Sequence, residues 1–486
     1  MRGFRLVVMA IMSLAVLVSM SGGQQEVFAQ AGTGPCDIYA SGGTPCVAAH
    51  STVRALFGAY SGRLYRVRRA SDSATSDIGT LTAGGFANTA AQDSFCAGTT
   101  CTITIIYDQS SRGNHLAQAP GGGAAGGPDA LANARSMRLV VGGHPVYAVF
   151  VSPGVGYRRN STSGIATGSQ AQGVYMVASG KHVNSGCCFD YGNAETNNND
   201  NGNGHMGAVY VGTLCWFGGV VAGQCFGSGP WVMADLENGL FAGGNGTNSN
   251  NTGRNSEYVT GMIKMNSTTY AIKDGNAQSG GLKTDYNGPL PTTSGYTPLH
   301  LEGAIILGIG GDNSKSDQGT FFEGAMTSGF PSDATENAVQ ANIVAAGYVT
   351  NTYFRVANRN SGKVLDVQQP NTSAGARVGQ FAANGQPWQD WQFVDVGGGF
   401  FNIVSRNSGM CLDVNGRSTA DGASIIQWNC NGQTNQQWQW RASGSFFQLV
   451  ARHSNKCVDV VGSSMADGAF VEQRTCSTAN NFLWSR

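Results

Sequence analysis

Two carboxylates and an amide, Asp235, Glu237 and Asn238, stand together in the apolar, aromatic stretch from Gly229 to Phe241. On a β-strand, residues two apart point to the same face, so the spacing predicts that Asp235 and Glu237 share one sheet face. Like charges on one face repel, and burial adds to that cost, so a fold keeps such acids where solvent, hydrogen bonds or a ligand offset it. The stretch therefore indicates either acid chemistry or an exposed strand edge with solvated acids.

A second acid follows the apolar run at Ile306, where Gly310 and Gly311 precede Asp312. The glycines let a ligand approach the backbone closely, so Asp312 is predicted at a sheet rim. Acid and base catalysis by a carboxyl pair needs one ionised carboxylate and one protonated carboxyl. We expect Glu237, in a polar, hydrogen-bonded setting, to be the ionised nucleophile and Asp312 to be the acid and base across a cleft. Asp235 then holds substrate.

Adjacent cysteines are uncommon, and this chain has Cys187 next to Cys188. Neighbouring Cα atoms lie about 3.8 Å apart, below the usual disulfide range, so a bond between these two would strain the chain and suggest a ligand clamp. The alternative is that each pairs elsewhere, for instance with Cys215 and Cys225. No His, Cys or Asp spacing nearby suggests a metal site.

The elements that must position these residues are short β-like runs between clusters of Gly, Asn and Ser. Helices are predicted at 51–60 and 333–346, the second capped by Ser332 or Asp333. Many strands with few helices indicate an all-β fold whose first domain is a large sandwich of two antiparallel sheets. The loop 197–204, nearly all Asn, Asp and Gly, is expected to be a turn at the rim of the active site. The predicted strands are 102–107, 139–141, 173–177 and 304–309.

From about residue 351 onward the chain repeats itself. A Leu/Val-Asp-Val mark recurs at Asp366, Asp413 and Asp459, which are 47 and 46 residues apart, and a Trp-containing mark closes each repeat. Three such units bury their apolar faces together, so a pseudo-threefold arrangement around the closing tryptophans is expected. Equal cysteine spacing within the second and third repeats predicts the disulfides Cys411–Cys430 and Cys457–Cys476.

Composition limits the partners of the chain. Its 486 residues include 71 Gly but only 12% charged residues, with 29 basic against 29 acidic. This balance offers no basic patch for nucleic acid or an anionic membrane and suits a neutral glycan. Residues 1–31 have a basic start, an apolar run and a small-x-small end, as in a cleaved secretion signal, and twelve cysteines fit an oxidising compartment. No cofactor is expected.

Several ordered segments resemble the glycoside hydrolase family 54 α-L-arabinofuranosidases: Cys187 to Asn193, Gly202 to Met206, Ala234 to Gly239 and Gly308 to Asn313. The resemblance implies a concanavalin-like sandwich and a retaining mechanism, with Glu237 as nucleophile and Asp312 as acid/base. It implies that Cys187 and Cys188 form a disulfide packed on the substrate, and that Trp216, Asp235, Asn238 and Gly311 hold a terminal arabinofuranose. It also implies the disulfides Cys36–Cys46, Cys96–Cys101 and Cys215–Cys225.

The three repeats resemble the ricin-type β-trefoil, in which each repeat can bind sugar through an Asp, an aromatic platform and a polar pair. The second repeat matches best, with Asp413, Trp428, Asn435 and Gln436. A carboxylate that accepts sugar hydroxyls beside an aromatic face suits a neutral glycan. The first repeat keeps Asp366 and Phe381 but has Trp388 in place of the amide. The third has Asp459 with Arg474 as the platform, which does not favour sugar.

The sequence thus predicts a signal peptide at 1–31, a sandwich catalytic domain at 32–349 and a trefoil at 350–486. The predicted function is a secreted, monomeric, retaining exo-α-L-arabinofuranosidase acting on arabinoxylan, arabinan or related plant polysaccharides, without nucleic-acid or membrane partners. Two alternatives stay open. One is a furanosidase for another glycone, such as β-D-galactofuranose, and the other is a lectin without catalysis.

Overall fold

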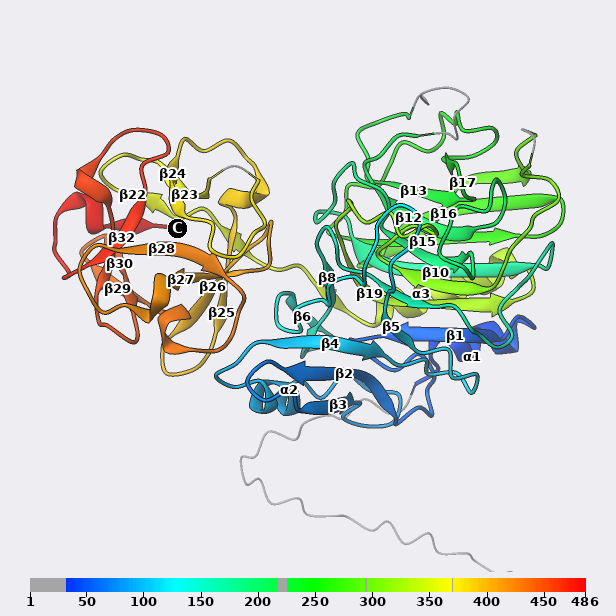
Figure 1. Cartoon of the computed structure of the whole chain (residues 1–486), viewed down its shortest axis with the longest axis horizontal. Helices are drawn as coiled ribbons and strands as arrows, with labels where there is room; N and C mark the ends of the chain where they lie inside the picture. Colours follow the sequence, from blue (N-terminus) through cyan, green and yellow to red (C-terminus); the bar gives the residue numbers. More distant parts are fainter. Residues whose placement is uncertain (1–31, 217–224, 293–294, 369) are drawn as a thin grey trace, which may run out of the picture. The chain divides into compact units, whose positions relative to one another are not determined.

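The computed structural model describes residues 32–216, 225–292, 295–368 and 370–486 (Figure 1). The predicted signal segment lies outside these residues. Among the described residues, no helix is long and apolar enough to cross a membrane.

The predicted all-β fold is confirmed, since two large antiparallel sheets carry the first domain. One sheet has the order β1-β19-β10-β15-β16-β17, with β8 beside β19. Figure 1 shows β10, β15 and β16 side by side in green. The strands of this sheet are β1 (Cys46–Ser51), β8 (Val149–Val151), β10 (Gln172–Ser179), β15 (Tyr258–Met265), β16 (Thr269–Asn276), β17 (Ser279–Pro289) and β19 (Gly319–Ser328).

The other sheet has the order β14-β13-β12-β11-β18-β9-β5-β4-β2-β3, and the candidate catalytic residues lie in loops that follow two of its strands. Its strands are β2 (Arg63–Arg69), β3 (Thr75–Gly79), β4 (Cys101–Ile106), β5 (Leu116–Gln118), β9 (Tyr157–Arg159), β11 (Asp190–Ala194), β12 (Gly207–Gly212), β13 (Trp231–Asp235), β14 (Leu240–Phe241) and β18 (Ala304–Leu307). A small third sheet contains β6 (Arg138–Val141), β7 (His144–Tyr147) and β20 (Tyr348–Val349).

Packing explains why the central strands read as continuous apolar runs. Every residue of β10 and of β15 is buried, which requires cover on both faces of the sheet. Strand β17, at the edge of the same sheet, is mostly exposed. The apolar surface that β10 and β15 remove from water stabilises the sandwich at roughly 25 cal/mol per Å².

One of the two predicted helices forms. Helix α3 (Asp333–Ala345) begins at Ser332, whose hydroxyl accepts the Thr335 N–H, as the cap prediction required. The helix predicted at 51–60 is wrong. Ser51 ends strand β1, and its hydroxyl accepts the N–H groups of Val53 and Arg54, which gives the backbone an alternative to helical bonds. Two short helices were not predicted, α1 (Pro35–Ser41) and α2 (Thr89–Phe95).

The second domain shows the expected threefold repetition. The indole N–H groups of Trp391, Trp438 and Trp484 donate to the carbonyls of residues 365, 412 and 458, each 26 positions earlier. All three rings are fully buried in one apolar core. The closing tryptophans are therefore structural.

The second domain's strands form one extended sheet. They are β21 (Tyr353–Phe354), β22 (Ala357–Asn358), β23 (Val364–Val367), β24 (Val378–Phe381), β25 (Trp391–Asp395), β26 (Phe401–Ser405), β27 (Cys411–Val414), β28 (Ala423–Trp428), β29 (Gln437–Ser443), β30 (Phe446–Ala451), β31 (Cys457–Val460), β32 (Val471–Arg474) and β33 (Trp484–Ser485). Short 3-10 turns connect them: η1 (Pro387–Gln389), η2 (Asn415–Arg417), η3 (Thr434–Gln436), η4 (Val461–Ser463) and η5 (Asn480–Phe482).

Candidate active site

Glu237 lies at the tip of a hairpin and not on a strand. Strand β13 ends at Asp235 and β14 begins at Leu240. Glu237 and Asn238 have φ angles of 63° and 51°, a left-handed pair typical of a tight hairpin turn. The prediction that Asp235 and Glu237 share a strand face is therefore wrong. A non-glycine residue with positive φ costs free energy, which the surrounding contacts must offset.

Besides its backbone hydrogen bond from Leu236 N–H to the Gly239 carbonyl, three side-chain hydrogen bonds hold this turn. The Glu237 N–H donates to Asp235 Oδ1 at 3.0 Å, and the Tyr296 hydroxyl donates to the Asn238 carbonyl at 2.8 Å. The Asn238 amide donates to Asp200 Oδ1 at 2.9 Å. Asp200 comes from the 197–204 loop, so this loop does reach the site. Together these contacts fix the direction of the Glu237 side chain.

Asp312 lies in a tight loop after β18. Its Oδ1 accepts the Ser314 N–H at 2.9 Å, and its carbonyl accepts the Ala124 N–H. The two preceding glycines are required by close neighbours. A Cβ on Gly310 would lie 2.3 Å from Ser314 Oγ, and one on Gly311 would lie 1.9 Å from an oxygen of Glu195. The loop therefore presents Asp312 half-buried at the rim, as the glycine pattern indicated.

One pocket of about 290 Å³ brings together all eight catalytic and substrate-binding residues named from the sequence. Residues from the hairpin tip, the Asp312 loop and the cysteine pair surround the same space. Its lining consists of Cys187, Cys188, Asp200, Met206, Leu214, Trp216, Asp235, Glu237, Asn238, Gly310, Gly311, Asp312 and Ser314.

Cys187 and Cys188 are bonded to each other across a cis peptide bond. Cys188 packs with buried Tyr210 and Trp231, while Cys187 Sγ lies 3.7 Å from Ser314 Oγ. The pair thus forms part of the pocket wall. The other five disulfides also form as named from the sequence: Cys36–Cys46, Cys96–Cys101, Cys215–Cys225, Cys411–Cys430 and Cys457–Cys476.

The electrostatics of Glu237 differ from the expectation of a polar setting that keeps it ionised. Glu237 is only 6% exposed, and burial, together with the neighbouring carboxyl of Glu195, raises the pKa of Glu237. Burial likewise raises the pKa of Asp235, which contacts the buried carboxyl of Asp190. The site therefore holds two carboxyl–carboxyl contacts.

No sequence motif indicated the charged groups beneath the pocket. Arg158, on β9, is buried, and its guanidinium donates to the carbonyls of Gly311 and Glu195. Burial lowers the pKa of Arg158 to about 10. Nothing in the Tyr-Arg-Arg sequence separates Arg158 from its exposed neighbour Arg159. Glu195 could have been found, because it stands two residues beyond the segment Cys187 to Asn193 that the sequence singles out.

The second repeat of the trefoil forms a shallow pocket of about 350 Å³ lined by Asp413, Trp428 and Asn435. Asp413 Oδ2 accepts amide N–H groups from Asn435 at 2.9 Å and Gln436 at 2.8 Å. Gln436 does not line the pocket, but its buried amide holds the Asp413 carboxylate in place. Burial raises the pKa of Asp413 to about 6. Trp428 is 41% exposed and can offer its ring to a ligand.

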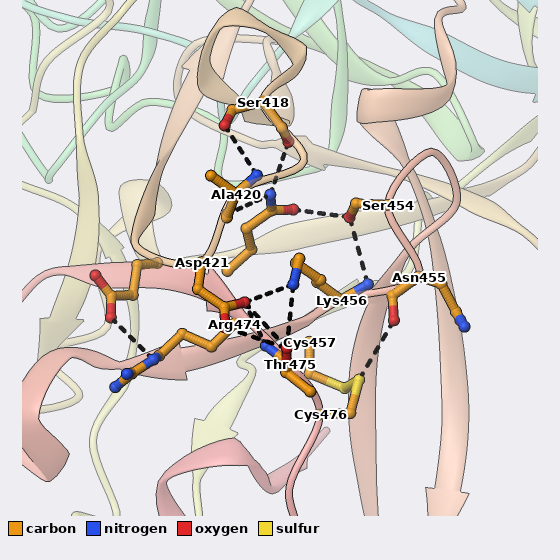
Figure 2. A network of polar contacts seen from close by, with 12 residues as sticks. Ser418, Ala420, Asp421, Ser454, Asn455, Lys456, Cys457, Arg474, Thr475 and Cys476 are labelled. Carbon is orange, nitrogen blue, oxygen red and sulfur yellow. Dashed lines mark hydrogen bonds and ion pairs between the residues drawn. A yellow bond between two sulfur atoms is a disulfide. The ribbon is translucent and has the colours of Figure 1, made fainter.

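The first and third repeats differ from the second. Asp366 and Phe381 line a pocket of about 570 Å³, where the Gln389 amide supports Asp366 at 2.9 Å. In the third repeat, Arg474 stands as platform and lies 3.8 Å from a carboxylate oxygen of Glu472. Figure 2 shows the polar network around it, in which Asp421 accepts from the Lys456 ammonium and the Thr475 backbone. The third repeat has charged groups where sugar needs an aromatic face.

Comparisons with known proteins agree with this geometry. The sequence model of a family described as α-L-arabinofuranosidase B, catalytic, matches residues 35–349, and one described as ricin-type β-trefoil lectin domain-like matches 341–428 and 434–486. A probable α-L-arabinofuranosidase B of Aspergillus terreus is 59% identical over 341 residues, covering 69% of this chain. An α-L-arabinofuranosidase of Hypocrea jecorina is 59% identical over 339 residues, also covering 69%. This chain covers 65% of the length of both relatives.

Solved structures give the same picture. A crystal structure of an arabinofuranosidase complexed with arabinofuranosyl-α-1,2-xylobiose is 38% identical, with a TM-score of 0.64. A family 54 α-L-arabinofuranosidase soaked with a cyclic sulfate inhibitor is 38% identical, with a TM-score of 0.65. Each match covers 93% of this chain and 98% of the other.

Proposed function

Because this chain belongs to the family of α-L-arabinofuranosidase B catalytic domains, we propose that it is a secreted, retaining, exo-acting α-L-arabinofuranosidase. The observation that carries the proposal is the single pocket that contains both Glu237 and Asp312, on separate loops. Two carboxyl groups that approach one small pocket from different segments can act on opposite sides of a glycosidic bond.

The proposed mechanism has two displacements. Glu237 attacks the anomeric carbon while Asp312 protonates the departing oxygen, which forms a covalent glycosyl-enzyme. Asp312 then removes a proton from water, which attacks the same carbon and releases arabinose with its original configuration. Asp235, Asn238, Gly311 and Trp216 hold the sugar, and the bonded cysteines form one wall. A pocket of about 290 Å³ suits one terminal sugar and favours exo action.

The substrates proposed are arabinofuranosyl side groups of arabinoxylan and arabinan. One relative was crystallised with arabinofuranosyl-α-1,2-xylobiose, which supports arabinose on a xylan backbone. A neutral glycan also fits the low charge of the chain. We expect the enzyme to act as a monomer.

Removal of each carboxylate tests the catalytic assignment. Glu237→Gln and Asp312→Asn keep side-chain shape. Glu237→Gln should abolish release of p-nitrophenol from the aryl α-L-arabinofuranoside, and Asp312→Asn should abolish its steady-state release after a first turnover. Asp395→Asn is the matched control, because Asp395 is exposed and lies in the trefoil. Full activity in either pocket variant would overturn the assignment.

A different glycone is the second candidate, because β-D-galactofuranose resembles α-L-arabinofuranose in ring stereochemistry. A panel of aryl furanosides separates the two. Preference for the arabinoside is expected, and preference for the galactofuranoside would change the assignment while leaving the mechanism intact. Binding to xylan without any sugar release would instead favour the lectin alternative.

We also propose that the trefoil anchors the enzyme to glycan through its second repeat. In that pocket Asp413 is supported by two amides and Trp428 is exposed. Asp366 and Phe381 form a weaker site in the first repeat. In the double variant with Asp413→Ala and Trp428→Ala, retention on insoluble xylan and on galactose resin should fall. Unchanged retention would exclude this repeat as the anchor.

Secretion is proposed from residues 1–31. When the full chain is expressed in a secreting host, the protein should appear in the culture medium. Edman sequencing should show that its amino terminus begins directly after Ala31. Protein that keeps residue 1 and stays inside the cells would contradict the proposal.

A further inference from the structure

A buried acid that the mechanism leaves unused lies directly beneath the nucleophile. Glu195 follows strand β11 and is 0% exposed. Its carboxyl lies within hydrogen-bonding reach of the Glu237 carboxyl. Because a Cβ on Gly311 would come within 1.9 Å of Glu195 Oε2, the Asp312 loop is seated on the same carboxyl group. Glu195 therefore contacts the segments that carry both proposed catalytic acids.

The Glu195 carboxyl has little support from donors. Among the residues that the structure describes, no other residue donates a hydrogen bond to either of its oxygens, and the one N–H that interacts with it is its own backbone N–H. The nearby cation, Arg158, donates instead to the backbone carbonyls of Gly311 and Glu195. Glu195 and Glu237 are buried and in contact, and the Glu195 carboxylate lacks donors from other residues. The two carboxyls therefore cannot both be ionised at low cost. Sharing one proton would meet this constraint, as it does for paired carboxyls in other active sites.

We propose that Glu195 is a positioning residue that keeps the shared proton and donates it as a hydrogen bond to Glu237. The Glu237 carboxyl then carries the negative charge and faces the pocket as nucleophile. Arg158 balances that charge from below while it ties the Gly311 carbonyl to the end of β11. This inference rests on the proposed function, because it assigns Glu195 a role in that reaction.

The arrangement resolves a conflict within the site. A nucleophile must be ionised, yet burial and a charged Glu195 both raise the pKa of Glu237. Protonation of Glu195 removes that repulsion. An O–H···O⁻ bond to a carboxylate is short and about twice as strong as a neutral hydrogen bond, so a protonated Glu195 stabilises the ionised form of Glu237. The same bond restricts the rotation of the Glu237 carboxyl, which the left-handed turn already directs.

Two variants of Glu195 separate this role from simple space filling. Glu195→Gln keeps the size and can donate an amide N–H to Glu237, whereas Glu195→Met keeps the length and has no donor. On the aryl furanoside that the wild type cleaves best, kcat should fall at most about tenfold in the Gln variant and roughly 100-fold or more in the Met variant. KM should change little in both, because Glu195 does not line the pocket.

The pH profile gives a readout that packing alone would not move. An amide is a weaker donor than a carboxylic acid, so Glu237 becomes easier to protonate in Glu195→Gln. The acid limb of kcat/KM should shift upward by roughly one pH unit. The groups that face this pair, and that stay unchanged in the variant, are Arg158, Asp190, Asp200, Asp235, Glu302 and Asp312.

Glu323→Gln is the control. Glu323 is as buried as Glu195, but it lies on β19 of the other sheet and forms an ion pair with Arg54. It should lower the melting temperature without moving the acid limb. Equal kcat in Glu195→Gln and Glu195→Met, with an unshifted acid limb, would overturn the proposal.

Neutron diffraction of the deuterated wild type tests the same point without a variant or a substrate. Nuclear density for a deuteron bonded to Glu195 and directed at Glu237 is expected. A deuteron bonded to Glu237, or none between the two, would overturn the proposal. If the wild type released no sugar from any furanoside, the proposed function would fail, whereas the position of the deuteron would still be measured.

Discussion

The catalytic pocket and the second trefoil pocket both contain a buried carboxylate, but they support it in different ways. Asp413 receives two amide N–H groups on one oxygen, which satisfies it and leaves the other oxygen for sugar hydroxyls. Within the described part of the chain, no amide donates to the Glu237 carboxyl, which instead contacts another carboxyl. Glu237 also lies in a left-handed turn, whereas Asp413 lies within a regular strand.

The difference follows from what each carboxylate must do. A carboxylate that only accepts hydrogen bonds works best when it is satisfied and rigid, and amides provide this at low cost. A nucleophile must form and break a covalent bond, so its partner has to adjust as its charge disappears. A shared proton can do so, because it remains on Glu195 when Glu237 is glycosylated.

The largest expected effect is that a substitution in the catalytic pocket abolishes catalysis, whereas one in the trefoil pocket leaves it unchanged. Glu237→Gln should lower kcat on the aryl α-L-arabinofuranoside by roughly 10⁴-fold, because the covalent step is lost. Asp413→Asn should leave that kcat within about twofold, because a small substrate needs no anchor. Steady-state kinetics on both variants is the measurement. A large loss of kcat in Asp413→Asn would show that the two pockets do not work separately.

A second contrast lies between two tryptophans of one repeat. Trp438 is fully buried in the trefoil core, so Trp438→Ala should lower the free energy of unfolding by about 3–5 kcal/mol. Trp428 is 41% exposed, so Trp428→Ala should cost about 0.5 kcal/mol or less while it reduces retention on glycan. Chemical denaturation measures both. Similar losses of stability would mean that Trp428 is a core residue and not a platform.

The smallest effect is the pH dependence of glycan retention. Burial raises the pKa of Asp413 to about 6, and only the ionised form accepts two hydroxyls. Retention should therefore be full well above pH 6 and should decline as pH falls through about 6. Affinity electrophoresis between pH 4 and 8 would follow it. In Asp413→Asn any weak residual retention should not vary over this range, and an equal pH dependence in that variant would exclude Asp413 as the titrating group.

Much of the fold and most of the pocket could be predicted because their signals are repeated or contiguous. The three Asp-Val marks set the trefoil in register, and Ser332 marked the start of α3. Glu237 and Asp312 stand in short segments whose composition is unusual for a chain with so few charges.

The parts that could not be predicted depend on tertiary contacts. Strand parity placed Asp235 and Glu237 on one face, whereas Tyr296 and Asp200 hold Glu237 in a turn that a glutamate rarely adopts. Arg158 looks like any surface arginine until the fold buries it under Gly311. The Ser51 hydroxyl and the pairing of β1 with β19 prevent the helix expected at 51–60.

The most direct test is to trap the covalent intermediate. Asp312→Asn still accepts an arabinosyl group from an activated aryl arabinofuranoside, because p-nitrophenolate leaves without a proton, but it removes the group slowly for lack of a base. Peptide mass spectrometry of the quenched variant should find one arabinosyl group, bonded to Glu237. An arabinosyl group on a different residue, or product of inverted configuration from wild type with no adduct, would contradict the account.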